Sequence, residues 1–227
     1  MKYFSYILAI SSIYFFVYAC QPAPCTDDGC PEWNELANPP DFEIKTPEVL
    51  EGEEIKGSLE NYYTIVPVVA TNDKDEFVYS LNQCIIHLYK DVPKEKQIPR
   101  ELIIAQAALE TGWGTSRFAN EANNLFGIRT WNKDEKYLLP IPWTEWPGWG
   151  VKVFETKCDS VAYYIRMINE VFAYEEFREV RQYHWDQGVE PDGLDLAHTL
   201  TKYASRVNYT DLVATLIKKN IRGVYEL

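Results

Sequence analysis

The chain alternates between segments with helical hydrophobic spacing and segments that are polar or rich in proline. The first regular segment, 73–92, has apolar residues three and four positions apart, as on one face of an α-helix. These residues are Phe77, Leu81, Cys84, Ile85 and Leu88. Asp73 and Asp75 stand at its start, where carboxylates suit the positive end of a helix dipole. The pattern predicts an amphipathic helix.

The segment 98–114, IPRELIIAQAALETGWG, predicts a second and more deeply buried helix. Pro99 suits the first turn of a helix and Gly112 the position just past its end. Between Leu102 and Leu109 only Gln106 is polar. A helix that is apolar nearly all round must be covered on all sides, so we expect this one at the centre of the domain.

The remaining segments predict an α+β fold that is mostly helical. Residues 128–156 contain PIPWTEWPGWG, which breaks any helical period and predicts a small β-hairpin lobe ending in GVKVF. Residues 160–184 predict one long amphipathic helix or a pair of helices. Two further helices are expected in 195–205 and 209–221, with a turn at 206–208 between them.

The N-terminal residues 1–20 have the pattern of an export signal. Lys2 precedes a long apolar run, and Ala19 stands directly before Cys20. The ending VYAC resembles a bacterial lipobox, in which the cysteine becomes the lipidated first residue, although Tyr18 is bulkier than is usual there. We expect a lipoprotein of the cell envelope, anchored in a membrane through Cys20. An uncleaved anchor and an ordinary signal peptide are the alternatives.

Charge and composition divide the rest of the chain. The formal net charge is −12, which disfavours nucleic acid because its binding depends on Lys and Arg. Seven acidic residues and two lysines lie in 41–60, so residues 21–60 are expected to form an acidic, proline-rich tether. The division is then a signal in 1–20, a tether in 21–60 and one domain in 61–227. We expect this domain to act as a monomer.

Export would place the other cysteines in an oxidising compartment. Four cysteines allow three pairings. Cys25 with Cys30 would close a small loop, leaving Cys84 with Cys158. The three histidines are scattered without the spacing of a zinc site, so no metal and no cofactor are expected.

Glu110 is the candidate for chemistry because it is a carboxyl at the end of the buried helix. It shares a stripe with Ile103 and Ala107, so its side chain begins on an inward face. Desolvation and the negative end of the helix dipole both disfavour the charged form and would raise its pKa. A carboxyl that stays protonated near neutral pH is what a glycosidase needs as general acid. The alternative is a last-turn glutamate that reaches water, with Gly112 as an ordinary C-cap.

The stretch AQAALETGWGTSRFANEANNLFGIRTW, 105–131, resembles the bacterial glucosaminidase domain of glycoside hydrolase family seventy-three, particularly its Bax-like branch. The shared elements are Ala-Gln-x-Ala-x-Glu-[Ser/Thr]-x-Trp-Gly and then Glu-x-Asn-Asn-Leu-Phe-Gly. The likeness continues in VFETKCDSVAYYIRMIN, AYEEFREVR and KYASRVNYTDLVATLIKKN, and covers roughly 62–221.

The resemblance implies a lysozyme-like α+β domain with a small β-hairpin lobe beside an active-site cleft. It implies hydrolysis of the β-1,4 bond after N-acetylglucosamine in peptidoglycan glycan strands. Glu110 matches the general acid and Tyr203 a tyrosine at the active site. The expected substrate-binding residues are those of the motifs, of the lobe and of the last helix: Trp113, Asn124, Phe126, Gly127, Trp131 and Tyr209.

The second carboxylate is where this sequence departs from the family, which often carries another glutamate on a mobile hairpin. The proline-rich lobe does not align cleanly here. Glu145 lies between Trp143 and Trp146 at about the right separation, with Glu135 as the fallback. The alternative for both glutamates is a solvated acid in a loop without a catalytic role. The tryptophans of the lobe, including Trp131, either stack on sugars or pack within the lobe.

Two other functions stay open. A lytic transglycosylase uses a single glutamate on the same fold and releases an anhydro-sugar. A non-catalytic, envelope-anchored glycan-binding module would not need Glu110 at all.

Overall fold

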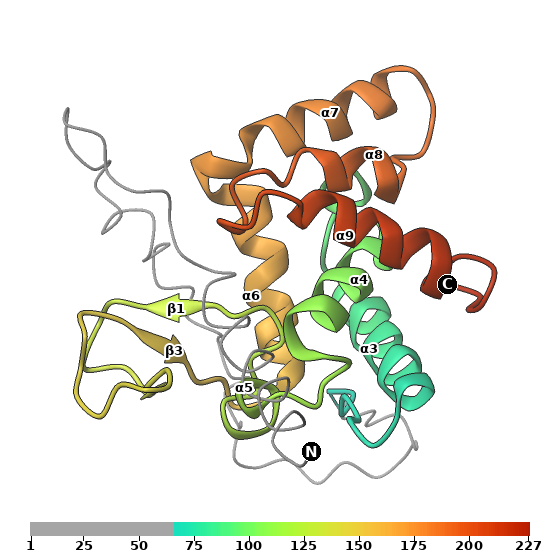
Figure 1. Cartoon of the computed structure of the whole chain (residues 1–227). Coiled ribbons are helices and arrows are strands. Elements are labelled where there is room, and N and C mark those ends of the chain that lie inside the picture. The colour runs from blue at the N-terminus through green and yellow to red at the C-terminus, as the bar shows by residue number, and fades with distance from the viewer. Residues whose placement is uncertain (1–65) are drawn as a thin grey trace, which may run out of the picture.

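The computed structural model describes residues 66–227. The expected signal, Cys20, the tether and the Cys25–Cys30 pair lie outside these residues. Within them the chain forms a helical body with a small sheet at one side (Figure 1). The prediction of a mostly helical α+β fold is therefore confirmed.

The central helix is α4 (Arg100–Thr111), and it is buried as its composition predicts. It packs against α3 (Lys74–Leu88), α8 (Gly193–His198) and α9 (Tyr209–Leu216), which surround it in Figure 1. Every residue from Leu102 to Ala108 is buried. Each of its large aliphatic side chains contributes roughly 1.5–3 kcal/mol by leaving water, so this helix anchors the core.

The predicted helix in 73–92 is confirmed as α3. Asp73 is its N-cap and accepts a hydrogen bond from the Glu76 amide at 2.9 Å. Pro99 is the N-cap of α4, one position before the first turn where the sequence analysis placed it.

The segment 160–184 forms a helix pair rather than one long helix. These are α6 (Lys157–Glu170) and α7 (Glu175–Asp186), joined by the 3₁₀ turn η2 (Phe172–Tyr174). Thr156 and Asp159 form a capping box that starts α6. A disulfide between Cys84 and Cys158, with Cα atoms 5.8 Å apart, joins α3 to α6, so this expected pairing is confirmed.

One helix boundary differs from the prediction. The helix expected over 195–205 ends at His198, because the hydroxyl of Thr199 donates to the Leu196 carbonyl at 2.7 Å and competes with the helical bonds. The helix expected over 209–221 has the predicted bounds, as α9 followed by the π-helical turn η3 (Ile217–Ile221). Short elements η1 (Lys94–Lys96) and α5 (Arg117–Glu121) have too few residues to show a period.

The β element is a three-stranded antiparallel sheet rather than a single hairpin. Its strands β1 (Arg129–Thr130), β2 (Tyr137–Leu138) and β3 (Gly150–Lys152) lie in the order β1-β3-β2. Arg129 pairs with Val151, and Tyr137 with Lys152. Behind β3, the Phe154 amide donates to the Ala122 carbonyl at 2.9 Å, which joins the sheet to the helical body.

No helix among residues 66–227 combines the length and the apolar character needed to cross a bilayer.

Candidate active site

Glu110 lies in the last turn of α4 and is partly buried. Its Oε1 atom is shielded from solvent, as an inward-facing position requires. Gly112 ends the helix in the left-handed conformation, with φ of 57°, and its amide donates to the Ala108 carbonyl. The carboxyl group therefore stands at the negative end of a buried helix, the setting that the sequence predicts.

The turn after Glu110 is a run of three residues with positive φ. Gly112, Trp113 and Gly114 have φ of 57°, 62° and 81°. For a bulky residue such as Trp113 this conformation stores roughly 1–3 kcal/mol of strain. The Thr111 hydroxyl holds the turn, since it donates to the Ala107 carbonyl at 2.5 Å and accepts from the Gly114 amide at 2.8 Å.

Gly114 allows a close approach of other parts of the chain. A Cβ atom there would lie 2.6 Å from Cγ2 of Thr71 and 2.8 Å from the Phe77 ring. The Trp113 ring meets Phe77 edge-on with centroids 6.4 Å apart, and the Lys74 ammonium lies 4.3 Å from it. Trp113 thus packs on α3, and its contact with substrate stays a prediction.

The segment Asn124–Gly127 is built around a buried asparagine. Asn124 has 0% exposure, and its amide donates to the carbonyls of Ile128 and Lys152, both at 2.8 Å. Its Oδ1 accepts from the Ile128 amide at 3.0 Å. Gly127 turns the chain with φ of 64°. Asn124 therefore ties this loop to β3, and a direct contact of Asn124 or Gly127 with substrate stays a prediction.

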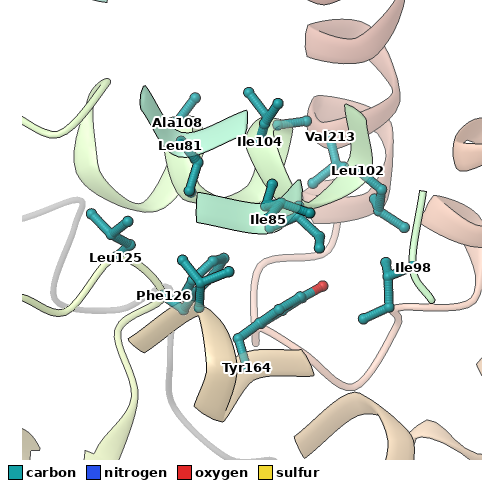
Figure 2. Close-up of a cluster of buried hydrophobic side chains, with 14 of the residues drawn as sticks. Leu81, Ile85, Ile98, Leu102, Ile104, Ala108, Leu125, Phe126, Tyr164 and Val213 are labelled. Carbon is teal, nitrogen blue, oxygen red and sulfur yellow. The ribbon is translucent and has the colours of Figure 1, made fainter. Parts of the chain in front are cut away.

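Phe126, Tyr203 and Tyr209 come together although they are far apart in sequence. The Tyr203 hydroxyl donates to the Phe126 carbonyl at 2.9 Å, and its ring stacks on Tyr209 with centroids 5.3 Å apart. The Phe126 ring stacks on Tyr164 of α6 with centroids 4.2 Å apart. Figure 2 shows both side chains in the buried core. All four side chains are buried. Burial raises the pKa of Tyr164, and Tyr164 is close enough to Glu110 for the charge of that carboxylate to act in the same direction.

Gln106 and Tyr164 are site residues that the sequence analysis did not assign. The Tyr164 hydroxyl donates to Oε1 of Gln106, and Nε2 of Gln106 donates to the Tyr209 hydroxyl at 3.0 Å. Burial raises the pKa of Tyr164 well above its ordinary value, and Tyr174, Tyr89 and Glu110 act in the same direction. The sequence feature that could have indicated this cluster is Gln106 itself, because it is the one polar residue between Leu102 and Leu109.

The two candidate second carboxylates differ in their surroundings. Glu145 is exposed in the loop between β2 and β3, next to Trp143, which is 54% exposed. Glu135 forms an ion pair with Lys152 at 2.5 Å. Burial acts to raise the pKa of Glu135, but hydrogen bonds from Lys152 and Thr130 and the charge of Lys152 outweigh it and lower the pKa.

The lobe tryptophans divide into packed and exposed rings. Trp146 meets Tyr137 with centroids 4.5 Å apart, and the Arg129 guanidinium lies 3.9 Å from the Trp149 ring. Trp131 follows β1 and is partly exposed, so its ring is available for a sugar face, and that role stays a prediction. Residues 66–227 contain no group of three or more His, Cys, Asp or Glu side chains able to hold a metal ion.

The described residues thus define an α+β domain whose central helix ends on a partly buried glutamate and whose core contains a cluster of packed tyrosines. The profile of the Glucosaminidase family, described as mannosyl-glycoprotein endo-beta-N-acetylglucosaminidase, matches residues 86–222. This match spans more than half of the chain. The chain belongs to this glucosaminidase family of glycoside hydrolases.

Individual relatives are distant. Protein bax of Escherichia coli (strain K12) is 29% identical over 128 residues, which are 55% of this chain and 44% of that protein. The chain therefore matches less than half of this relative. A peptidoglycan hydrolase from Sphingomonas sp. A1 has a TM-score of 0.44 and 22% identity, over 61% of this chain and 83% of that one. The catalytic domain of the Listeria monocytogenes autolysin Auto has a TM-score of 0.46 and 21% identity, over 73% and 96%.

The close approach at Gly114 predicts a stability difference between two glycine variants. Gly114→Ala and Gly188→Ala share the strain of a positive φ, but nothing lies within 4 Å of a Cβ at Gly188. We expect Gly114→Ala to lose about 1–3 kcal/mol more unfolding free energy, because Thr71 and Phe77 must move. Urea unfolding of both variants measures the difference. Equal losses would contradict the proposed contact.

Proposed function

We propose that this protein is an endo-β-N-acetylglucosaminidase that hydrolyses the β-1,4 bond after N-acetylglucosamine in peptidoglycan, with Glu110 as general acid. The observation that carries the proposal is the position of Glu110, whose Oε1 is shielded at the end of a buried helix inside the segment that matches the family. Among the similar structures, Auto is an autolysin and the Sphingomonas protein is a peptidoglycan hydrolase.

The proposed role of Glu110 follows from its surroundings. Screening from water and the negative end of the α4 dipole both disfavour a carboxylate and favour the neutral acid. A neutral carboxyl group can donate its proton to the oxygen of the leaving sugar as the glycosidic bond breaks. Tyr203 is proposed to border this reaction, since its ring meets Tyr164 edge-on and the charge of Glu110 acts on Tyr164.

For the second carboxylate the surroundings favour Glu145 over Glu135. A general base or nucleophile needs free lone pairs, and those of Glu135 are engaged by Lys152. Glu145 is exposed next to an exposed tryptophan. A wide separation from Glu110 would give inversion through an activated water, and a close one a covalent intermediate. The N-acetyl group of the substrate is a third possible nucleophile.

We also propose that the domain works outside the cytoplasm, held to a membrane by lipid on Cys20. The support is the order Lys2, apolar run, Ala19, Cys20 at the start of the sequence. An acidic tether in 21–60 would then hold the domain away from the bilayer and limit its reach.

Glu110→Gln tests the general acid. The amide has nearly the same shape but no acidic proton, so we expect activity on isolated peptidoglycan to fall by about 10²–10⁴-fold while folding and binding persist. Mass spectrometry of the digest identifies the products. Reducing N-acetylglucosamine ends support hydrolysis, and anhydromuramyl ends support a lytic transglycosylase. An active Glu110→Gln protein would exclude the proposed mechanism and leave the glycan-binding module.

Glu145→Gln and Glu135→Gln form a matched pair for the second carboxylate. We expect Glu145→Gln to lower kcat by about 100-fold or more without affecting stability, because the side chain is exposed. Glu135→Gln should keep activity and lose at most about 1 kcal/mol, since its ion pair is partly solvated. Initial rates and urea unfolding measure both. The reverse order of activities would assign the role to Glu135.

Cys20→Ser tests the lipid anchor, with Cys25→Ser as control. We expect Cys20→Ser to leave the membrane fraction while Cys25→Ser stays in it, because only Cys20 occupies the lipidated position. Cell fractionation and the mass of the N-terminal peptide measure this. Membrane attachment of the Cys20→Ser protein, or a mature N-terminus elsewhere, would contradict the proposal.

A further inference from the structure

Gln106 is a polar side chain in the most apolar part of the protein. It has 0% exposure, and it lies between fully buried alanines on α4. Glu110 follows it by four positions, one helical turn, so the two side chains start from the same side of the helix. A buried amide is costly unless it is hydrogen-bonded, and the partners of Gln106 come from two other helices.

Both ends of the Gln106 amide are hydrogen-bonded. Tyr164 donates its hydroxyl proton to Oε1 of Gln106. The amide nitrogen faces the Tyr209 hydroxyl and donates to it at 3.0 Å. Gln106 therefore joins α4 to α6 and α9.

These contacts close into a ring in which hydrogen bonds and stacked aromatic pairs alternate. Tyr164 stacks on Phe126 at 4.2 Å, the Phe126 carbonyl accepts from Tyr203 at 2.9 Å, and Tyr203 stacks on Tyr209 at 5.3 Å. The Tyr209 hydroxyl accepts from Nε2 of Gln106, which closes the ring. We call these five residues the Gln106 ring: Gln106, Phe126, Tyr164, Tyr203 and Tyr209. Figure 2 shows Phe126 and Tyr164 beside the buried residues of α4.

We propose that Gln106 is a positioning residue for catalysis, which acts by holding the Gln106 ring closed against the inner side of Glu110. This inference rests on the proposed function of Glu110. The closed ring fixes Tyr203 relative to α4 through Tyr209 and Gln106, and Oε1 of Glu110 is shielded from water. An open ring would let water reach the carboxyl and favour its charged form.

A role in stability alone makes a different prediction from a positioning role. A purely structural Gln106 would change the fraction of folded protein but not the pH dependence of the folded enzyme. A positioning residue changes kcat more than KM, since it acts on the orientation and protonation of the acid rather than on the binding of the glycan.

The test uses Gln106→Met and Tyr164→Phe in the full chain, with Tyr89→Phe as control. Methionine has the length of glutamine without the amide, and Tyr164→Phe removes only the hydroxyl that donates to Gln106. Tyr89→Phe makes the same chemical change outside the ring, where the hydroxyl donates to the Ile98 carbonyl. The measurements are kcat and KM on soluble glycan fragments, the pH profile of kcat/KM, and urea unfolding.

We expect both ring variants to lower kcat by about 10- to 100-fold with little change in KM, because small displacements of a catalytic group have such effects. The alkaline limb of the pH profile should move to lower pH, and Tyr89→Phe should leave both unchanged. Folded ring variants with wild-type kcat and pH profile would overturn the inference. So would unfolding of both ring variants alongside a folded control, since the ring would then be structural only.

Failure of the inference is distinguishable from failure of the proposed function. An inactive Glu110→Gln protein with fully active ring variants would exclude the role of Gln106 alone. An active Glu110→Gln protein would exclude the proposed function, whatever the ring variants do.

Discussion

Burial of α4 from Leu102 to Ala108 is the constraint on which the rest of the structure depends. A helix that is apolar on all sides is stable in water only when other elements cover every side of it. In this domain α3, α8 and α9 do so, and the disulfide between Cys84 and Cys158 ties α3 to α6. Because α4 cannot shift or fray without exposing the core, its last turn is the best-fixed place for a reactive group. Glu110 occupies that turn.

The same constraint explains the irregular backbone after Glu110. The chain must leave a buried helix within a few residues and return toward α3, and a run of three positive φ angles makes that turn. Thr111 stabilises it through bonds to Ala107 and Gly114. The glycines and the tryptophan beside the carboxyl group therefore serve first to end the helix and to pack against α3.

The parts that sequence predicts are those with a local signal. The course of α4 follows from one apolar run between Pro99 and Gly112, and α3 follows from a single period. The sheet order β1-β3-β2 cannot be predicted in this way, because strands of two or three residues are too short to show an alternation of apolar and polar residues. The Gln106 ring cannot be predicted from local sequence either. Its hydrogen bonds join residues 58, 77 and 103 positions apart, and only the finished packing brings such partners together.

The Gln106 ring also shows why a polar group belongs in this core. Apolar contacts are not directional, so α6 and α9 could pack on α4 in more than one rotation at similar free energy. The amide accepts from Tyr164 of α6 and donates to Tyr209 of α9, so both helices must present a hydroxyl group to it. Buried polar groups that are fully hydrogen-bonded specify a unique core in this way. Here the same contacts also hold Tyr203, which stacks on Tyr209 and donates to the Phe126 carbonyl, so the packing of the core and the placement of this candidate site residue are set together.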